Sequence, residues 1–226
     1  EQVILANPDQ VLLVFAVRNP EPHRRMLDRF LVLAEYAGLP AVIGVNKVDL
    51  DEVGPDGVPL SRMIFGDYEA VYPVHYLSAR TDQGLAELRA ALDGKITAVA
   101  GPSGVGKSSL LNRLDPEGRR AIAEISTATG KGRHTTTATQ LYRLDPRTFI
   151  ADTPGIRALA MHGVPPAELD RCYPELRPWL GQCFYADCTH LHEPGCAVRQ
   201  ALEEGKIPIQ RYESYASLRR GDTAED

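Results

Sequence analysis

Residues 101–108 read GPSGVGKS, and this stretch decides the fold class. It matches G-x-x-x-x-G-K-[ST] at every fixed position. The apolar run ITAVAG (96–101) leads into it, and the helical pattern KSSLLNRL (107–114) continues from its end. Strand, glycine-rich loop and helix form the context that a phosphate-binding loop requires. The sequence therefore predicts an α/β fold with a nucleotide site at this loop.

The residue types of this loop suit phosphate chemistry. Glycines let the backbone bring its N–H groups up to phosphate oxygens, and the helix N-terminus adds a positive dipole end. Lys107 supplies a positive charge for the β and γ phosphates, and Ser108 supplies a hydroxyl for Mg²⁺. The candidate phosphate-binding residues are Gly101, Pro102, Ser103, Gly104, Val105, Gly106, Lys107, Ser108 and Ser109.

A second element of the site is expected at DTPG, residues 152–155, which follows the apolar run TFIADT (148–153). Asp152 at the end of a strand can hold Mg²⁺, usually through water, and the backbone N–H of Gly155 can reach the γ phosphate. Alone, D-x-x-G is usually only a turn. Beside a phosphate loop it predicts the metal side of the site.

Two further loops predict selectivity for guanine. NKVD (46–49) ends the run AVIGVN, and Asp49 can accept hydrogen bonds from two guanine N–H groups that adenine lacks. Asn46 suits the N7 side of the base and can tie loops together, while the stem of Lys47 can pack over the ring. SAR (78–80) resembles the loop whose backbone recognises the guanine oxygen. Each motif alone could be a surface turn, but together they predict GTP over ATP at Asn46, Lys47, Val48, Asp49, Ser78, Ala79 and Arg80.

Short apolar runs alternate with helical patterns over the first 155 residues, as in an α/β domain with a mainly parallel sheet. Strands are expected at 11–17, 41–46, 74–79, 96–101, 140–144 and 148–153, and helices at 22–37, 82–92, 107–114, 197–204 and 209–219. After residue 156 the chain becomes rich in proline and cysteine. We expect a nucleotide-binding domain over 1–156 and a small helical, zinc-binding domain over 157–226.

The segment STATGKGRHTTTATQ (126–140) carries few large apolar residues and no helical or strand period. It can bury too little surface to offset its own ordering entropy. Two interpretations remain open: an irregular surface loop, or a switch that becomes ordered when a ligand binds.

CFYADCTHLHEPGC (183–196) has the spacing C-x₄-C-x-H-x₅-C. Three thiolates and an imidazole make a tetrahedral structural zinc set with no open position for catalysis. The candidate ligands are Cys183, Cys188, His190 and Cys196, with His192 as the alternative histidine. Cys172 lies outside the cluster and is expected to be an ordinary buried or free thiol.

Bulk composition excludes several classes. A hydrophobic content of 43% argues against disorder along the whole chain, and the net charge of −5 does not favour nucleic-acid binding by charge alone. The longest apolar run, VLLVFAV at 11–17, is far shorter than the roughly 20 residues of a membrane helix. Without a signal-type segment at its start, the chain is expected to be cytoplasmic and monomeric, with no membrane association.

The motifs occur in the order NKVD, SAR, phosphate loop, threonine-rich segment and DTPG, a circular permutation of the usual GTPase order. With GRHTTT (132–137) and the cysteine cluster, the chain resembles the RsgA (YjeQ) family of small-ribosomal-subunit biogenesis GTPases. The resemblance implies a circularly permuted P-loop GTPase sheet that binds GTP or GDP with Mg²⁺, plus one structural Zn²⁺. It also implies that Thr135 or Thr136 completes the Mg²⁺ shell. Because Ile156 occupies the position of the water-orienting Gln of Ras-like enzymes, it further implies that His134 positions the attacking water.

The resemblance implies that the partner is the small (30S) ribosomal subunit with its rRNA. It also implies that GTP hydrolysis is slow, is stimulated by this subunit and occurs late in the maturation of the subunit. Family members carry an N-terminal OB-fold barrel, which is expected to be absent because the patterns leading to NKVD begin almost at once. One alternative is a nucleotide-gated ribosome-binding module with vestigial hydrolysis. Another is a permuted GTPase of the large subunit, which the cysteine cluster disfavours. We also hypothesise that nucleotide state moves the C-terminal module through DTPG.

Overall fold

The computed structural model describes residues 7–115, 123–125, 139–152 and 164–221. Within them, seven strands form one sheet in the order β3-β2-β1-β4-β7-β6-β5. The strands β1, β2, β3, β4 and β7 run parallel to one another, whereas β5 and β6 pair antiparallel at one edge. The bounds are β1 Gln10–Ala16, β2 Ala41–Asn46, β3 Val74–Tyr76, β4 Ile96–Ala100, β5 Ala123–Ile125, β6 Thr139–Arg143 and β7 Phe149–Asp152.

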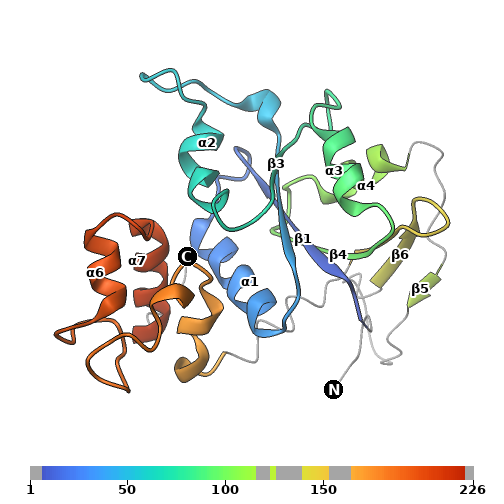
Figure 1. Ribbon diagram of the computed structural model, residues 1–226. Helices are drawn as coiled ribbons and strands as arrows, with labels where there is room; N and C mark the ends of the chain where they lie inside the picture. Colours follow the sequence, from blue (N-terminus) through green and yellow to red (C-terminus); the bar gives the residue numbers. More distant parts are fainter. Residues whose placement is uncertain (1–6, 116–122, 126–138, 153–163, 222–226) are drawn as a thin grey trace, which may run out of the picture.

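Helices cover both faces of this sheet (Figure 1). One face carries α1 (Arg24–Tyr36) and α2 (Leu60–Phe65), and the other carries α3 (Leu85–Leu92) and α4 (Lys107–Leu114). The C-terminal part contains α6 (Ala197–Glu203) and α7 (Ile209–Arg220); α7 packs against α1, and α6 lies on the far side of α7 in Figure 1. Short 3₁₀ turns complete the described elements at Val48–Leu50, Gly66–Tyr68, Pro166–Glu168, Asp170–Cys172 and Arg177–Trp179.

The continuous apolar run of β1 is explained by its central position in the sheet. Successive side chains of a strand point to opposite faces. Leu13 and Phe15 pack with α1 in one core cluster, while Leu12 and Val14 pack with the α3 and α4 side in another. All seven residues of β1 are buried. A strand that is covered on both faces must be apolar at odd and even positions alike.

A third core cluster belongs to the C-terminal part. It includes Leu169, Tyr173, Val198 and Tyr215, and it also takes in Val32 from α1. The described residues from 164 onward therefore have a core of their own that is continuous with α1.

All of the expected strands and helices are present: β2 and α4 have the expected bounds, and the others differ by a few residues at their ends. The strand expected over 74–79 ends at Tyr76, and the helix expected from 82 begins at Leu85, after Gly84 at φ +70°. The strand expected at 140–144 begins one residue earlier, at Thr139, so the last two residues of the segment 126–140 belong to β6. The six-residue α2 and three-residue β5 were not predicted because such short elements show no measurable period.

Candidate functional site

One side chain brings three predicted motifs together. Asn46, buried at the end of β2, donates from Nδ2 to the backbone oxygen of Val105 in the phosphate loop at 2.9 Å. Its Oδ1 accepts a hydrogen bond from the backbone N–H of Ala79 in the SAR loop at 3.1 Å. The carboxyl ends of parallel strands meet at one edge of a sheet, which is where α/β folds bind ligands. NKVD, SAR and GPSGVGKS therefore form one site.

The carboxylate of Asp49 is held at both oxygens. Ser78 Oγ donates to Oδ1 at 2.6 Å, and Arg80 Nε donates to Oδ2 at 2.7 Å. The Asp49 side chain is only 9% exposed, whereas that of Arg80 is 74% exposed. The Ser78 hydrogen bond, followed by the Arg80 contact, lowers the pKa of Asp49 against the opposing effect of burial. Asp49 is thus a fixed, ionised acceptor, the form that can receive two N–H groups of a base.

Lys47 adds another tie between the loops. It has a positive φ of 65°, and its ammonium donates to the backbone oxygens of Asn19 and of Gly104, the latter at 2.7 Å. The following residue, Val48, opens the 3₁₀ turn that carries Asp49. These contacts place the NKVD loop directly against the phosphate loop.

Two glycines of the phosphate loop have no substitute. Gly101 has φ +143°, and a Cβ there would lie 2.0 Å from the backbone oxygen of Val14. Gly106 has φ +94°, and its Cβ would lie 2.6 Å from Nδ2 of Asn46. At Gly101 the neighbour is backbone, which leaves no room for a side chain; at Gly106 the neighbour is the Asn46 amide, which two hydrogen bonds hold in place, and the positive φ itself favours glycine.

Lys107 is the first residue of α4, and its ammonium reaches back over the loop to the backbone oxygens of Gly101 at 2.9 Å and Pro102 at 2.7 Å. Ser108 and Ser109 lie exposed in the first turn of the same helix, and Ser103 and Gly104 are exposed in the loop. The helix start, the ammonium and the hydroxyls therefore share one accessible surface, which suits a polyphosphate.

Of the predicted magnesium-binding element DTPG (152–155), only Asp152 belongs to the described residues. Asp152 ends β7, and its Cα pairs with that of Val99 in β4, the strand that leads into the phosphate loop. This backbone register brings residue 152 to the same edge of the sheet. His134, Thr135, Thr136 and Gly155 lie outside the described residues, as does Ile156.

The four predicted zinc ligands come together in the C-terminal part. One ligand atom each from Cys183, Cys188, His190 and Cys196 lies within 4.8 Å of all the others. His190 Nδ1 is 3.5 Å from Cys183 Sγ and 3.4 Å from Cys196 Sγ, and those two sulfurs are 3.9 Å apart. Tetrahedral zinc bonds of about 2.0–2.3 Å require ligand atoms roughly 3.4–3.8 Å apart. The donor set therefore fits one ion.

The chemistry of these side chains supports the same assignment. The Nε2 of His190 faces the carboxylate of Asp170 at 3.6 Å, so that Nδ1 is the nitrogen directed at the sulfurs. Burial lowers the pKa of His190, which favours the neutral imidazole that binds metals. His192 is exposed and stands outside the cluster. Cys172 is buried and also outside it, and burial raises the pKa of its thiol to about 11.

The sequence did not predict how α7 holds the loop of candidate zinc ligands, residues 183–196, which we call the metal loop. Tyr212 donates from its hydroxyl to the backbone oxygen of His190, and Tyr215 to that of Thr189, both at 2.7 Å. Tyrosines three apart on a helix share a face, so the helical pattern at 209–219 gave a possible signal. The backbone oxygens that accept these hydrogen bonds lie in a loop, and a loop has no sequence period from which the contacts could be predicted.

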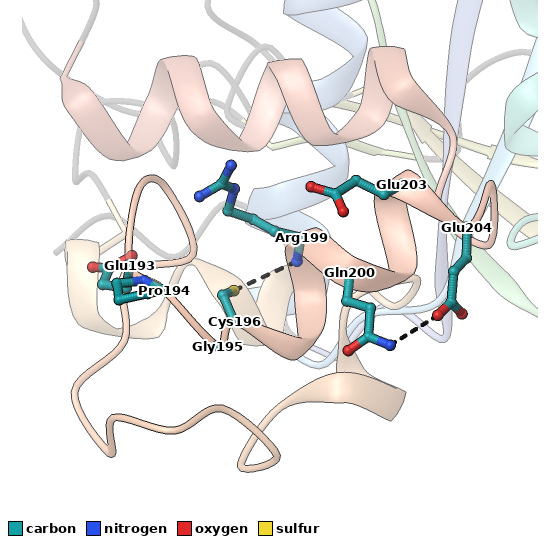
Figure 2. A pocket seen from close by; sticks show the side chains of 8 residues that line it. All are labelled: Glu193, Pro194, Gly195, Cys196, Arg199, Gln200, Glu203 and Glu204. Carbon is teal, nitrogen blue, oxygen red and sulfur yellow. Dashed lines mark hydrogen bonds between the residues drawn. The ribbon is translucent and has the colours of Figure 1, made fainter.

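Beside the metal loop lies a shallow hollow of about 570 Å³ (Figure 2). Its walls include Glu193 and Cys196 on the loop side and Arg199 and Glu203 on α6. The backbone N–H of Arg199 donates to Cys196 Sγ at 3.5 Å. Three glutamates and one arginine are the charged residues that line this hollow.

The comparisons with known proteins agree with this geometry. Residues 1–162 match the model of the RsgA GTPase family. This chain belongs to the RsgA GTPase family. Its permuted motif order agrees with this family. The guanine-type loops follow β2 and β3, and the phosphate loop follows β4, which comes later in the chain.

Relatives within the RsgA family are similar over nearly all of the chain. It is 50% identical over 220 residues to the "Small ribosomal subunit biogenesis GTPase RsgA" of Gemmatimonas aurantiaca, covering 97% of this chain and 70% of that protein. The RsgA of Thermotoga maritima is 42% identical over 215 residues, covering 95% of this chain and 71% of that protein.

Two solved structures share the fold. The crystal structure of YjeQ from Thermotoga maritima superposes with a TM-score of 0.79 at 38% identity, covering 97% of this chain and 73% of that one. YloQ, described as a circularly permuted GTPase, gives 0.74 at 33% identity, covering 97% and 70%. Among the helices described for this RsgA-family chain, none has the length and apolar character to cross a membrane.

Proposed function

We propose that this chain hydrolyses GTP in the maturation of the small ribosomal subunit, the process named for its RsgA relatives. The observation that carries the nucleotide part is Asn46, which links the two guanine-type loops to the phosphate loop within hydrogen-bonding distance. In this site Asp49 accepts the two guanine N–H groups, a backbone N–H of the SAR loop (78–80) binds the guanine oxygen, and Asn46 supports both loops. Lys47, Val48, Ser78 and Arg80 complete the base-binding set.

Phosphoryl transfer to water relies mainly on positioning and charge. Lys107 and the loop backbone from Gly101 to Ser109 bind the phosphates, and Mg²⁺, when bound, neutralises charge that develops on the phosphate oxygens. Ser108 and Asp152 hold this ion, with Thr135 or Thr136 as a further ligand. The N–H of Gly155 binds the γ phosphate, and His134 orients the attacking water.

The C-terminal part serves as a structural zinc module in this proposal. Cys183, Cys188, His190 and Cys196 hold one Zn²⁺, and the compatible spacing of their ligand atoms supports it. The division falls at residues 1–156 for the GTPase domain and 157–226 for the zinc module. We propose a cytoplasmic monomer whose partner is the 30S subunit with its rRNA.

A turnover assay tests this function. GTP hydrolysis is measured for the wild-type chain and Lys107→Ala, each with and without purified small subunits. We expect stimulation of the wild type by the subunits and loss of most turnover in Lys107→Ala, because the ammonium at the phosphates is gone. ATP serves as the matched control substrate and should not be hydrolysed.

The same assay separates the alternatives. Nucleotide-dependent cosedimentation with 30S particles without any turnover would support a ribosome-binding module with vestigial hydrolysis. Stimulation by large subunits alone would overturn the assignment of the partner. Equal turnover by the wild type and Lys107→Ala would overturn the phosphate site.

A further inference from the structure

The loop that carries the predicted metal ligands is organised around one carboxylate. Glu193 Oε1 accepts hydrogen bonds from the backbone N–H of Thr189 at 2.9 Å and from its hydroxyl at 2.5 Å. Oε2 accepts from the backbone N–H groups of Leu191 and His192, each at 3.2 Å. Three backbone N–H groups and one hydroxyl, all from residues 189–192, therefore converge on one carboxylate. Such converging N–H groups form an anion-binding concavity, and here the anion belongs to the chain itself.

These donors surround a metal ligand on both sides. His190 stands between Thr189 and Leu191, and its backbone has a positive φ of 61°. That conformation is rare for a residue with a side chain and needs support from its surroundings. The Glu193 carboxylate supplies the support by fixing the N–H groups before and after His190.

The opposite side of the same backbone is fixed by α7. Tyr215 and Tyr212 donate to the backbone oxygens of Thr189 and His190. The peptide units around His190 are thus held from their N–H side by Glu193 and from their oxygen side by α7. Cys188 Sγ also lies 3.7 Å from Glu193 Oε2, which places the carboxylate beside a second ligand.

We infer that Glu193 is a positioning residue for the metal site: it sets the backbone conformation that directs His190 Nδ1 at the cysteine sulfurs. This inference deepens the proposed zinc site and rests on it. Glu193 is not a ligand, because its carboxylate is occupied by the loop donors and it stands outside the cluster of four. Groups that orient metal ligands typically change metal affinity by about 10- to 100-fold when altered.

The test compares Glu193→Gln with Glu203→Gln in the full chain. Glu203 is an exposed acid on α6 that lines the same hollow, so both changes remove one negative charge from the same face of the module. In Glu193→Gln one acceptor oxygen becomes an NH₂ donor that must face N–H groups. Zinc affinity is measured by competition with a chromophoric chelator. We expect a loss of about 10- to 100-fold for Glu193→Gln and less than about twofold for Glu203→Gln.

A spectroscopic readout distinguishes positioning from general loss of structure. At saturating Co²⁺, Glu193→Gln should keep the tetrahedral absorption spectrum of the wild type, because all four ligands remain. Wild-type affinity in Glu193→Gln, or an equal loss in Glu203→Gln, would overturn the role of Glu193. A wild-type chain that binds neither zinc nor cobalt would instead overturn the metal site on which the inference rests.

Residue-level amide exchange keeps the inference testable if the variant does not fold. In the metal-loaded wild type, the N–H groups of Leu191 and His192 should exchange slowly because both donate to Glu193. The N–H of Asp187, on an exposed residue of the same loop, serves as the comparison. Exchange of Leu191 and His192 as fast as that of Asp187 would contradict the proposed contacts.

Discussion

Arg211 of α7 forms a buried ion pair with Asp28 of α1, across 183 residues of sequence. The guanidinium also donates to Glu175 at 2.5 Å, and it lies between the rings of Tyr68 and Tyr173 at 5.2 and 4.7 Å from their centroids. Its side chain is 1% exposed. The helix that contacts the loop of candidate zinc ligands is therefore anchored to α1. If nucleotide state moves the C-terminal module, α7 and α1 should move together.

Arg211→Met should destabilise the chain strongly. The change leaves the carboxylates of Asp28 and Glu175 buried without their cation, and breaking such a pair costs about 3–5 kcal/mol. The control is Arg171→Met, because Arg171 is 73% exposed and contacts Glu168 at 3.6 Å on the surface. That change should cost less than about 1 kcal/mol. Denaturant unfolding measures both, and equal midpoints would refute the structural importance of the buried pair.

Asn46→Ala should weaken GDP binding by about 30-fold. Two hydrogen bonds between loops are lost, each contributing about 1 kcal/mol to loop positioning. Asn112→Ala provides the control, since Asn112 is exposed on α4. Fluorescence titration with a labelled GDP gives both affinities. Unchanged binding in Asn46→Ala would mean that the three loops do not depend on this side chain.

Asp49→Asn should shift the preference from guanine to xanthine nucleotides. The new NH₂ group opposes the guanine amino group but can donate to the oxygen that xanthine carries in its place. We expect GDP affinity to fall by about 100-fold or more, since hydrogen bonds to a charged acceptor contribute about 1.5–3 kcal/mol each. Competition between GDP and XDP measures the switch. Asp56→Asn, in an exposed turn, should keep the wild-type preference.

The acid titration of Asp49 should depend on both Ser78 and Arg80. Both contacts lower the pKa of Asp49, so their stabilising effect is present above the unfolded pKa and is lost as the pH falls through the folded value. Removing either contact should raise the pKa. Ser78→Ala removes the largest single cause, and Arg80→Ala removes both a hydrogen bond and a positive charge. NMR titration of the Asp49 carboxyl carbon measures each shift, and a downward shift in either variant would contradict this account.

Zinc binding at neutral pH should release about two protons or more. Burial raises the pKa of Cys188 to about 12 and also raises that of Cys196, so both thiols are protonated before the metal binds. Zinc must displace these protons, and its apparent affinity should fall as the pH is lowered. Calorimetry in buffers of different ionisation enthalpy counts the protons. Release of none would show that the two thiols are not metal ligands.

The sequence by itself determined the α/β class, the strands on either side of each motif and the identity of the candidate site residues. It could do so because these features are local: a glycine-rich loop between a strand and a helix, or cysteines at metal-binding spacing, is readable without tertiary contacts. The short elements β5 and α2 were not predicted, because their sequences show no measurable period.

Only the tertiary structure decided which distant residues meet. The sheet order places β2 and β4 on either side of β1, and that arrangement lets Asn46 reach Val105, 59 residues later. The choice of His190 over His192, the four hydrogen bonds to Glu193 and the anchoring of Arg211 against Asp28 likewise depend on packing. The sequence could not predict these contacts, because each joins residues from separate elements or from a loop, and only the packing of the folded chain brings those residues together.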